Sequence, residues 1–231
     1  TVYNKESDVI STQTDDITVA AGKTETISQS VDVANPKLWS VDSPNLYWVR
    51  TEIIQNGKVV DRTDSRFGIR YIATNPNSGF YLNGVHTKLN GVCEHSDLGS
   101  LGMETYQAAV DRRIRTLKKY GVNAIRTSHN PVSPEFIEAC DRLGMLVFEE
   151  AFDQWLYSKN SDDYHNYFNK AADGKTVVFD KAGNDNTNND TSYIEVKRED
   201  LQSNAERDIK AMVDRDKNAP CIFAWSTGNE I

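Results

Sequence analysis

The sequence predicts a multidomain protein in which an antiparallel β domain precedes a domain that alternates strands and helices. Residues 1–69 carry short β-branched runs separated by turn signals such as Asn56-Gly57, which is typical of antiparallel strands joined by tight turns. From residue 70 to residue 231, apolar strand-like runs alternate with amphipathic helical patterns, which favours a parallel sheet covered by helices. We therefore place the domain boundary between residues 69 and 70.

The first domain is expected to be part of a β-sandwich. Its predicted strands cover residues 16–20, 25–33, 46–55 and 58–64. In the third of these, Tyr47, Val49, Thr51 and Ile53 alternate with more polar residues, which indicates one buried face. An immunoglobulin-like sandwich needs about seven strands in roughly 100 residues. We therefore expect residues 1–69 to be an immunoglobulin-like domain truncated at its start.

The second domain is predicted to begin with a hairpin and to continue as strand-helix units. A turn at Asn83-Gly84 is expected to pair residues 79–82 with residues 88–93. Apolar residues recur every three to four positions in the predicted helices 104–120, 134–143 and 201–213. The remaining predicted strands cover residues 122–127, 145–148 and 221–225.

Polar residues at the strand ends distinguish a barrel from an open sheet. Each parallel strand runs into residues that can do chemistry: Glu94-His95, Arg126 with His129, Glu149-Glu150 with Asp153, and Asn229-Glu230. In a (β/α)8 barrel such ends meet at one mouth. A nucleotide-binding open sheet would need a glycine-rich phosphate loop, which the GSLG run at 99–102 does not provide. Residues 70–231 are therefore predicted to form the first four βα units of a (β/α)8 TIM barrel.

A polar insertion interrupts this pattern at about residues 158–198. It contains the run GNDNTNND at 183–190, which cannot bury enough apolar area to offset its ordering entropy. We expect this run to be exposed and more mobile than its flanks. The tyrosines and phenylalanine nearby leave open that the insertion is a substrate-binding lid.

Charge and composition exclude several classes of partner. The net charge is -8, with 34 acidic and 26 basic residues, which disfavours nucleic acid and anionic lipid surfaces. No stretch approaches the roughly 20 apolar residues of a membrane helix. Three widely spaced cysteines in apolar runs predict buried reduced thiols and neither disulfides nor a zinc site. The chain is expected to be soluble; its compartment and assembly state, including a homo-oligomer, stay open.

The residues at the predicted mouth fit sugar chemistry. Carboxylates, a histidine, an arginine, an asparagine and tryptophans occur there together. Retaining glycoside hydrolysis uses two carboxyl groups roughly 5 to 5.5 Å apart, and one of them has a raised pKa so that it can donate a proton. Within the chain, Glu230 and Glu150 are the candidates for this pair.

Four motifs in a fixed order resemble glycoside hydrolase family 2. They are KLNGVCEHSDLGSLG at 88–102, GVNAIRTSHNP at 121–131, CDRLGMLVFEEAFDQW at 140–155 and WSTGNE at 225–230. Upstream, LWSVDSPNLY at 38–47 and RFGIR at 66–70 are similar to the immunoglobulin-like domain of that family and its junction with the barrel. The resemblance implies a retaining glycosidase that cleaves terminal β-D-galactosides through a glycosyl-enzyme intermediate.

The resemblance also implies roles for single residues. Glu230 would be the general acid/base, and Asn229 would bind the sugar 2-hydroxyl. His129 and His95 would contact the sugar, and Arg126 would hold the catalytic carboxylates. Asp153 and Trp155 would also lie at the sugar subsite. The structural alternatives are that the histidines only order their loops and that Trp155 is a core residue.

Further expectations concern what the chain lacks. The family's nucleophile is a glutamate on the seventh strand, which would lie beyond Ile231, so the isolated chain is expected to be inactive and Glu150 to be a structural partner of Arg126. Gln154 and Leu156 replace the metal ligands of metal-using relatives, so we expect no metal and no cofactor. The alternatives are a β-glucuronidase-like specificity and a non-catalytic carbohydrate-binding or scaffold fragment.

Overall fold

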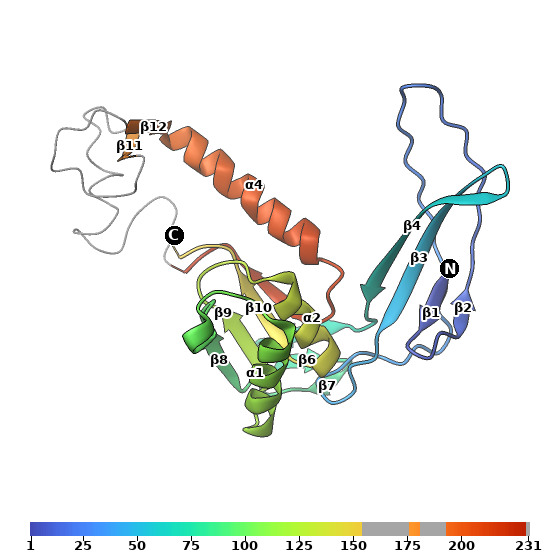
Figure 1. Cartoon of the computed structure of the whole chain (residues 1–231). Coiled ribbons are helices and arrows are strands. Elements are labelled where there is room, and N and C mark those ends of the chain that lie inside the picture. Colours follow the sequence, from blue (N-terminus) through green and yellow to red (C-terminus); the bar gives the residue numbers. More distant parts are fainter. Residues whose placement is uncertain (154–175, 181–192, 230–231) are drawn as a thin grey trace.

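The computed structural model of the chain describes residues 1–153, 176–180 and 193–229 (Figure 1). An antiparallel β domain lies at one end of the molecule, and an α/β domain with a long projecting helix makes up the rest. The predicted mobile run at 183–190 lies outside the described residues. No helix in the described part of the chain has the length and apolar character of a membrane span.

The first domain contains a four-stranded antiparallel sheet in the order β2-β1-β3-β4. Its strands are β1 (Val2–Asn4), β2 (Val9–Ser11), β3 (Tyr47–Gln55) and β4 (Lys58–Phe67). Asn56 and Gly57, which join β3 to β4, both have positive φ angles, of 52° and 75°. This is the backbone that a two-residue hairpin turn requires. The strands predicted at 46–55 and 58–64 are thus confirmed.

The strands predicted at 16–20 and 25–33 are absent. Residues 12–38, all of which are described, contain no strand, and they form a long excursion away from the sheet (Figure 1). Ile17, Val19 and Ile27 are exposed on this excursion. The prediction was wrong because a β-branched run expresses only a preference for a pleated, half-buried surface. In the described structure these residues have no neighbouring strand to provide that surface.

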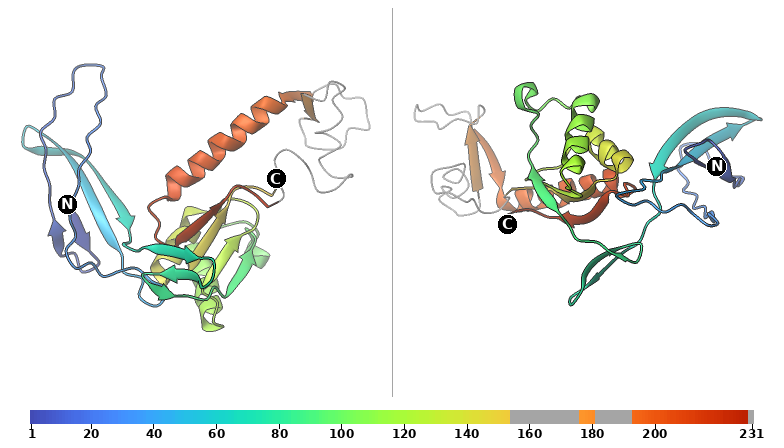
Figure 2. Two further views of the ribbon diagram at one scale, coloured as in Figure 1. Left: turned by 180° about the vertical axis from the view of Figure 1, so that it is seen from behind. Right: turned by 90° about the horizontal axis from the view of Figure 1, so that it is seen from below.

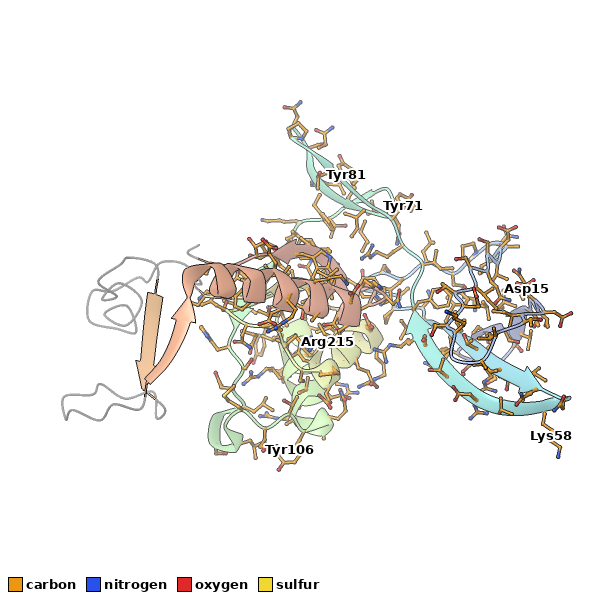
Figure 3. The ribbon with its side chains drawn as sticks, turned by 90° about the horizontal axis from the view of Figure 1, so that it is seen from above. Asp15, Lys58, Tyr71, Tyr81, Tyr106 and Arg215 are labelled. Carbon is orange, nitrogen blue, oxygen red and sulfur yellow. The ribbon has the colours of Figure 1, made fainter. Side chains whose placement is uncertain are left out.

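A small three-stranded sheet follows, and it corrects the second predicted hairpin. It consists of β5 (Ile72–Asn75), β6 (Gly79–Leu82) and β7 (Val85–His86). The tight turn at Asn83-Gly84 pairs Leu82 with Val85, so residues 79–82 do not pair with 88–93. Figure 3 shows Tyr81 on this projecting sheet and Tyr71 at its base, just before β5. The strand β8 (Gly91–Glu94) joins a different sheet.

The α/β domain is built on a parallel sheet in the order β13-β10-β9-β8. Its further strands are β9 (Ala124–Thr127), β10 (Leu146–Glu150) and β13 (Ile222–Ser226). The helices are η1 (Gly99–Leu101), α1 (Gln107–Lys119), α2 (Pro134–Leu143) and α4 (Arg198–Asp216). The hairpin of β11 (Thr176–Asp180) and β12 (Tyr193–Lys197) lies within the expected insertion. As predicted, β13 lies parallel beside β10.

Helices α1 and α2 pack side by side against this sheet (Figure 2). Ser133 caps α2 by accepting a hydrogen bond from the Phe136 N–H, and Pro134 occupies the first turn. Gly144 ends the helix in the left-handed conformation. All three cysteines are free thiols; Cys140 and Cys221 are buried as predicted. Cys93 is exposed, contrary to the prediction, because its strand β8 is the last strand of the described sheet.

Buried contacts join segment 39–46, which precedes β3 in the first domain, to the α/β domain. Trp39 is fully buried, and its indole N–H donates to the Asp141 carbonyl over 2.8 Å. The Asp141 carboxylate accepts from the Arg66 guanidinium over 3.0 Å and from the Cys221 N–H over 3.0 Å. The ammonium of Lys118 donates to the carbonyls of Val41, Leu143 and Gly144. These contacts fix segment 39–46 against α2.

We expect Gly144→Ala to destabilise the protein far more than Gly121→Ala. Both glycines have positive φ, of 74° and 82°, so either alanine costs about 1 kcal/mol in backbone strain. A Cβ at Gly144 would also collide with the Val41 carbonyl, whereas the space at Gly121 is open. Urea unfolding should show a loss of about 3 kcal/mol or more for Gly144→Ala. Equal losses for the two variants would contradict the packing of segment 39–46 on α2.

A second buried cluster lies where α4 meets the sheet. Glu149 is fully buried, and Arg215 donates to its Oε1 over 3.2 Å and to the Val132 carbonyl over 2.8 Å. The other Glu149 oxygen, Oε2, is buried without a hydrogen-bond partner. Burial and then the negative charge of Asp216 raise the pKa of Glu149 to about 8. Glu149 is therefore protonated at neutral pH. Arg215 is labelled at this end of α4 in Figure 3.

This cluster predicts that the protein loses stability as the pH rises. The pKa of Glu149 is about 8 in the folded protein and about 4.5 without its environment, so the folded state holds an extra proton between these values. The stabilisation is complete below about pH 4.5 and is lost as the pH rises through about 8. Between pH 5 and 8 the resulting loss in the free energy of unfolding amounts to roughly 2 to 4 kcal/mol.

Glu149→Gln tests this prediction because glutamine imitates the protonated acid. Urea unfolding at pH 5, 6, 7 and 8 should give the variant a flatter dependence of unfolding free energy on pH than the wild type. Glu52→Gln, at an exposed position of β3, is the matched control and should follow the wild type. Parallel profiles for all three proteins would show that Glu149 does not titrate in this range.

Candidate active site

The C-terminal ends of β9, β10 and β13 bring polar side chains together on one face of the sheet. Glu150 pairs in register with Ser226, and Phe148 with Arg126. Successive side chains of a strand point to opposite faces, so Phe148 and Glu150 share a face and Glu149 points to the other. The long side chain of Arg126 reaches from the level of Phe148 to Glu150.

Glu150 is the centre of this cluster. Its side chain is 1% exposed. Arg126 donates to it from Nε over 3.0 Å and from a terminal nitrogen over 2.8 Å, and the Ser226 hydroxyl donates over 2.9 Å. Burial opposes ionisation, but hydrogen bonds from His129, Arg126 and Ser226 outweigh it and lower the pKa of Glu150. Glu150 is therefore a carboxylate whose two oxygens are both engaged.

His129 lies in the loop after β9 and contacts this carboxylate. Its Nδ1 is 2.6 Å from Glu150 Oε1, and its side chain is 20% exposed. The His95 ring, from the loop after β8, stands edge-to-face against the His129 ring with centroids 5.7 Å apart. The neighbouring Asn130 amide donates to the Ser96 hydroxyl over 2.7 Å. The two histidine-bearing loops are thus tied together.

Asn229 is held from three directions. Its Oδ1 accepts from Arg126 over 2.6 Å, and its Nδ2 donates to Asp153 Oδ1 over 3.2 Å. Its backbone N–H donates to the Phe152 carbonyl over 2.9 Å. The loop after β13 is therefore locked to the loop after β10. This arrangement fixes an amide side chain at the mouth of the sheet.

The structure brings together most of the residues that the sequence singled out. Arg126, His129, Asp153 and Asn229 lie in one network with Glu150, and His95 joins it through ring contact. Glu230 and Trp155 lie outside the described residues. Their positions and the catalytic role of each of these residues stay predictions.

Two acidic residues at strand ends belong elsewhere. Glu94 points away from the cluster and pairs with Arg113 of α1 over 2.6 Å. Burial raises the pKa of Glu94 against the opposing effect of Arg113. Glu149 faces Arg215 of α4 over 3.2 Å. Successive side chains of a strand point to opposite faces of the sheet. Glu94 and Glu149 are each one residue away from a position that faces the mouth, so both carboxyls point away from it.

Sequence reasoning missed two hydroxyl groups in the network. The Ser226 hydroxyl donates to Glu150 over 2.9 Å and lies 3.2 Å from the Gly228 carbonyl. Thr127 accepts from the Glu150 N–H over 2.9 Å. The position of Ser226 inside the motif at 225–230 was a usable signal, whereas nothing in the sequence distinguished Thr127 from other strand threonines.

The described residues contain no candidate metal-binding site. In those ranges no group of three or more histidine, cysteine, aspartate or glutamate side chains is arranged to hold a metal ion. The expectation of no magnesium site rested on Gln154 and Leu156, which lie outside the described residues. That expectation therefore stays untested.

Comparison with known families matches nearly the whole chain. The model described as the TIM barrel domain of glycosyl hydrolases family 2 matches residues 74–231. A second model, described as glycosyl hydrolases family 2, matches residues 1–70.

Individual relatives agree with these matches. The chain is 37% identical over 211 residues to the β-galactosidase BoGH2A of Bacteroides ovatus, covering 91% of this chain and 21% of that protein. It is 37% identical over 203 residues to a putative β-glucuronidase of Formosa agariphila, covering 88% and 16%. The chain thus spans about a fifth of the length of these curated relatives.

Solved structures place the fold in the same family. The crystal structure of a glycosyl hydrolase family 2 member from Bacteroides cellulosilyticus superposes with a TM-score of 0.77 at 34% identity, covering 100% of this chain and 26% of that one. A β-glycosidase from Bacteroides vulgatus gives a TM-score of 0.67 at 34% identity, over 85% and 21%. The chain therefore belongs to glycoside hydrolase family 2, with parts of its immunoglobulin-like and TIM barrel domains.

Proposed function

We propose that this chain supplies the acid/base half of the active site of a retaining β-glycosidase that hydrolyses terminal β-D-galactosides. One observation supports this most directly. The side chain and backbone of Asn229 are held by Arg126, Asp153 and Phe152. The residue that follows Asn229 in the sequence is Glu230, and an acid/base catalyst must be delivered to the glycosidic oxygen with such precision.

In the proposed mechanism Glu230 acts twice. It first donates its proton to the departing glycosidic oxygen while a nucleophilic carboxylate forms a bond to the anomeric carbon. The resulting Glu230 carboxylate then removes a proton from water, which attacks the anomeric carbon and releases the nucleophile. Asn229 donates from its amide to the sugar 2-hydroxyl. The two steps leave Glu230 protonated again, so the cycle closes.

We propose that Glu150 is not the nucleophile. A nucleophilic carboxylate needs one oxygen free to approach the anomeric carbon. Both oxygens of Glu150 accept hydrogen bonds, and the side chain is 1% exposed. The nucleophile is then a glutamate outside residues 1–231, on a later strand of the barrel. The described parallel strands represent the first four βα units of that barrel.

The remaining residues bind the sugar in this proposal. His129 and His95 contact sugar hydroxyls from the paired loops after β8 and β9. Asp153 and Trp155 complete the subsite. Arg126 keeps Glu150 ionised and orients Asn229. The partner is a carbohydrate, and nucleic acid, membranes and cofactors have no part in the reaction. The proposed domains cover residues 1–69 and 70–231.

The galactoside specificity is supported by the relative BoGH2A, which is named a β-galactosidase. A β-glucuronidase is the second candidate, because a relative of equal identity is named a putative β-glucuronidase. The third candidate is a non-catalytic carbohydrate-binding or scaffold fragment. Each of these alternatives predicts a different result in the assays below.

We expect Glu230→Gln to slow substrates selectively according to their leaving group. In the protein that contains this chain, aryl β-galactosides with poor leaving groups should lose about 100- to 10,000-fold in rate, because they need protonation. Activated aryl leaving groups depart without it, and added azide should restore their turnover by attacking the intermediate without base assistance. Steady-state rates over a series of leaving-group pKa values provide the measurement.

The matched variant is Glu150→Gln, which should lose activity without azide rescue. Uniform losses for Glu230→Gln across the series, with no rescue, would refute its role as acid/base. Chain 1–231 alone should show no turnover. Robust turnover by that chain would require a nucleophile within it and would make Glu150 the first candidate.

Specificity is tested with p-nitrophenyl β-D-galactoside and p-nitrophenyl β-D-glucuronide. We expect kcat/KM for the galactoside to exceed that for the glucuronide by at least about 100-fold, because a site that lacks a partner for the carboxylate must bury it unpaired. The reverse preference would establish the glucuronidase. Binding of galactose without turnover of any glycoside would establish the non-catalytic alternative.

Removal of divalent cations should leave activity intact. Gln154 and Leu156 stand where metal-using relatives carry ligands, so no magnesium site is expected beside Glu230. The measurement compares kcat/KM before and after dialysis against EDTA. Loss of activity that only added magnesium restores would show that this expectation is wrong.

A further inference from the structure

The contact between Glu150 and His129 determines which ring nitrogen carries a proton. Nδ1 of His129 lies 2.6 Å from Glu150 Oε1. Glu150 already accepts from Arg126 and Ser226, and an ionised carboxylate can only accept hydrogen bonds. Nδ1 must therefore be the donor. In a neutral imidazole with a protonated Nδ1, Nε2 carries the lone pair.

The Glu150 carboxylate is already paired with one cation, Arg126, so its contact with His129 does not require an imidazolium. Arg126 forms hydrogen bonds to both oxygens of Glu150 and neutralises its charge. The Arg126 guanidinium and His129 share Oε1, at 3.0 Å and 2.6 Å. A second positive charge at this distance would be repelled by Arg126 within a largely buried site. Among the other acidic residues nearby, Glu94 and Glu149 are engaged by Arg113 and Arg215 on the other face, and Asp153 accepts from the Asn229 amide.

We propose that Glu150 is a positioning residue that sets the tautomer of His129, so that Nε2 presents a hydrogen-bond acceptor to a sugar hydroxyl. The sugar-binding part rests on the proposed function; the tautomer does not. Glu150 thereby has two tasks. It pairs with the half-buried Arg126, and it decides whether the proposed sugar contact accepts or donates a hydrogen bond.

The substitution Glu150→Gln should reverse the polarity of His129. The amide oxygen of glutamine would face Arg126, because a guanidinium has only donors. The amide NH2 would then face His129 and donate to Nδ1. The ring would consequently carry its proton on Nε2. A merely structural role for Glu150 predicts no such exchange of tautomers in a folded variant.

The tautomer can be read directly from the nitrogen signals of the ring. Chain 1–231 with 15N-labelled histidine contains four such rings, and His129→Gln identifies the signals of His129 by their disappearance. Long-range proton-nitrogen spectra at pH 7 should show a protonated Nδ1 and an unprotonated Nε2. In Glu150→Gln these states should be exchanged. Glu94→Gln, which removes a different strand-end carboxylate, is the control and should leave His129 unchanged.

The spectra test the proposal even if the Glu150→Gln variant does not fold. A protonated Nε2 or a fully protonated ring in the wild type overturns it, whether or not Glu150→Gln folds. An unchanged His129 ring in a folded Glu150→Gln variant overturns it as well. Neither measurement needs a substrate, so the result is independent of whether the protein proves to be a glycosidase.

The acceptor role toward sugar is tested in the glycosidase itself with deoxyfluoro galactosides. Fluorine cannot donate a hydrogen bond, so at one of positions 3, 4 and 6 its introduction should lower wild-type kcat/KM by at least about 10-fold. In Glu150→Gln the loss at that position should largely disappear, because Nε2–H can donate to fluorine. Equal losses in both proteins at every position overturn the acceptor role. Absence of any wild-type turnover would instead refute the proposed function and leave the spectral result standing.

Discussion

The arrangement of the candidate site depends on the need to compensate one buried carboxylate, Glu150. A buried charge is costly unless it is paired and hydrogen-bonded. Arg126, His129 and Ser226 meet this need from β9, the loop after it and β13. Arg126 then extends the network to Asn229. The same interaction that stabilises the folded sheet therefore sets the positions of the polar side chains at its mouth.

A similar constraint operates at the junction of the two domains. Asp141 of α2 is buried. Its carboxylate accepts hydrogen bonds from Arg66 of β4 and from the N–H of Cys221, the residue before β13. Trp39, from segment 39–46, donates to the carbonyl of Asp141. Because β13 carries Ser226 and leads to Asn229, the contact at Asp141 and the candidate site share a strand. Segment 39–46 and the candidate site are thus joined through Asp141 and β13.

Most elements of the α/β domain were predictable because their signals are local. The helix at 134–143 is defined by a capping serine, a first-turn proline and a terminal glycine, and the structure reproduces its bounds. The failures occurred where a strand needs a partner. The runs at 16–20 and 25–33 have β patterns but no ladder, and residues 88–93 were assigned to the wrong partner. The choice of pairing partner is made in the assembled sheet, and the residue pattern along one strand does not identify that partner.

The sequence by itself determined the family, through four motifs in a fixed order, and the set of residues around which the site is built. The resemblance to the family also singled out Glu150 as the partner of Arg126, but nothing in the sequence predicted where the adjacent Glu149 would lie. Glu149 and Glu150 are identical in type, yet Glu150 joins Arg126 and Glu149 is buried beside Asp216 with its pKa raised to about 8. Only the tertiary structure decided this, because the face that a strand residue occupies depends on the register of β10 between β9 and β13 and on the helices packed outside them.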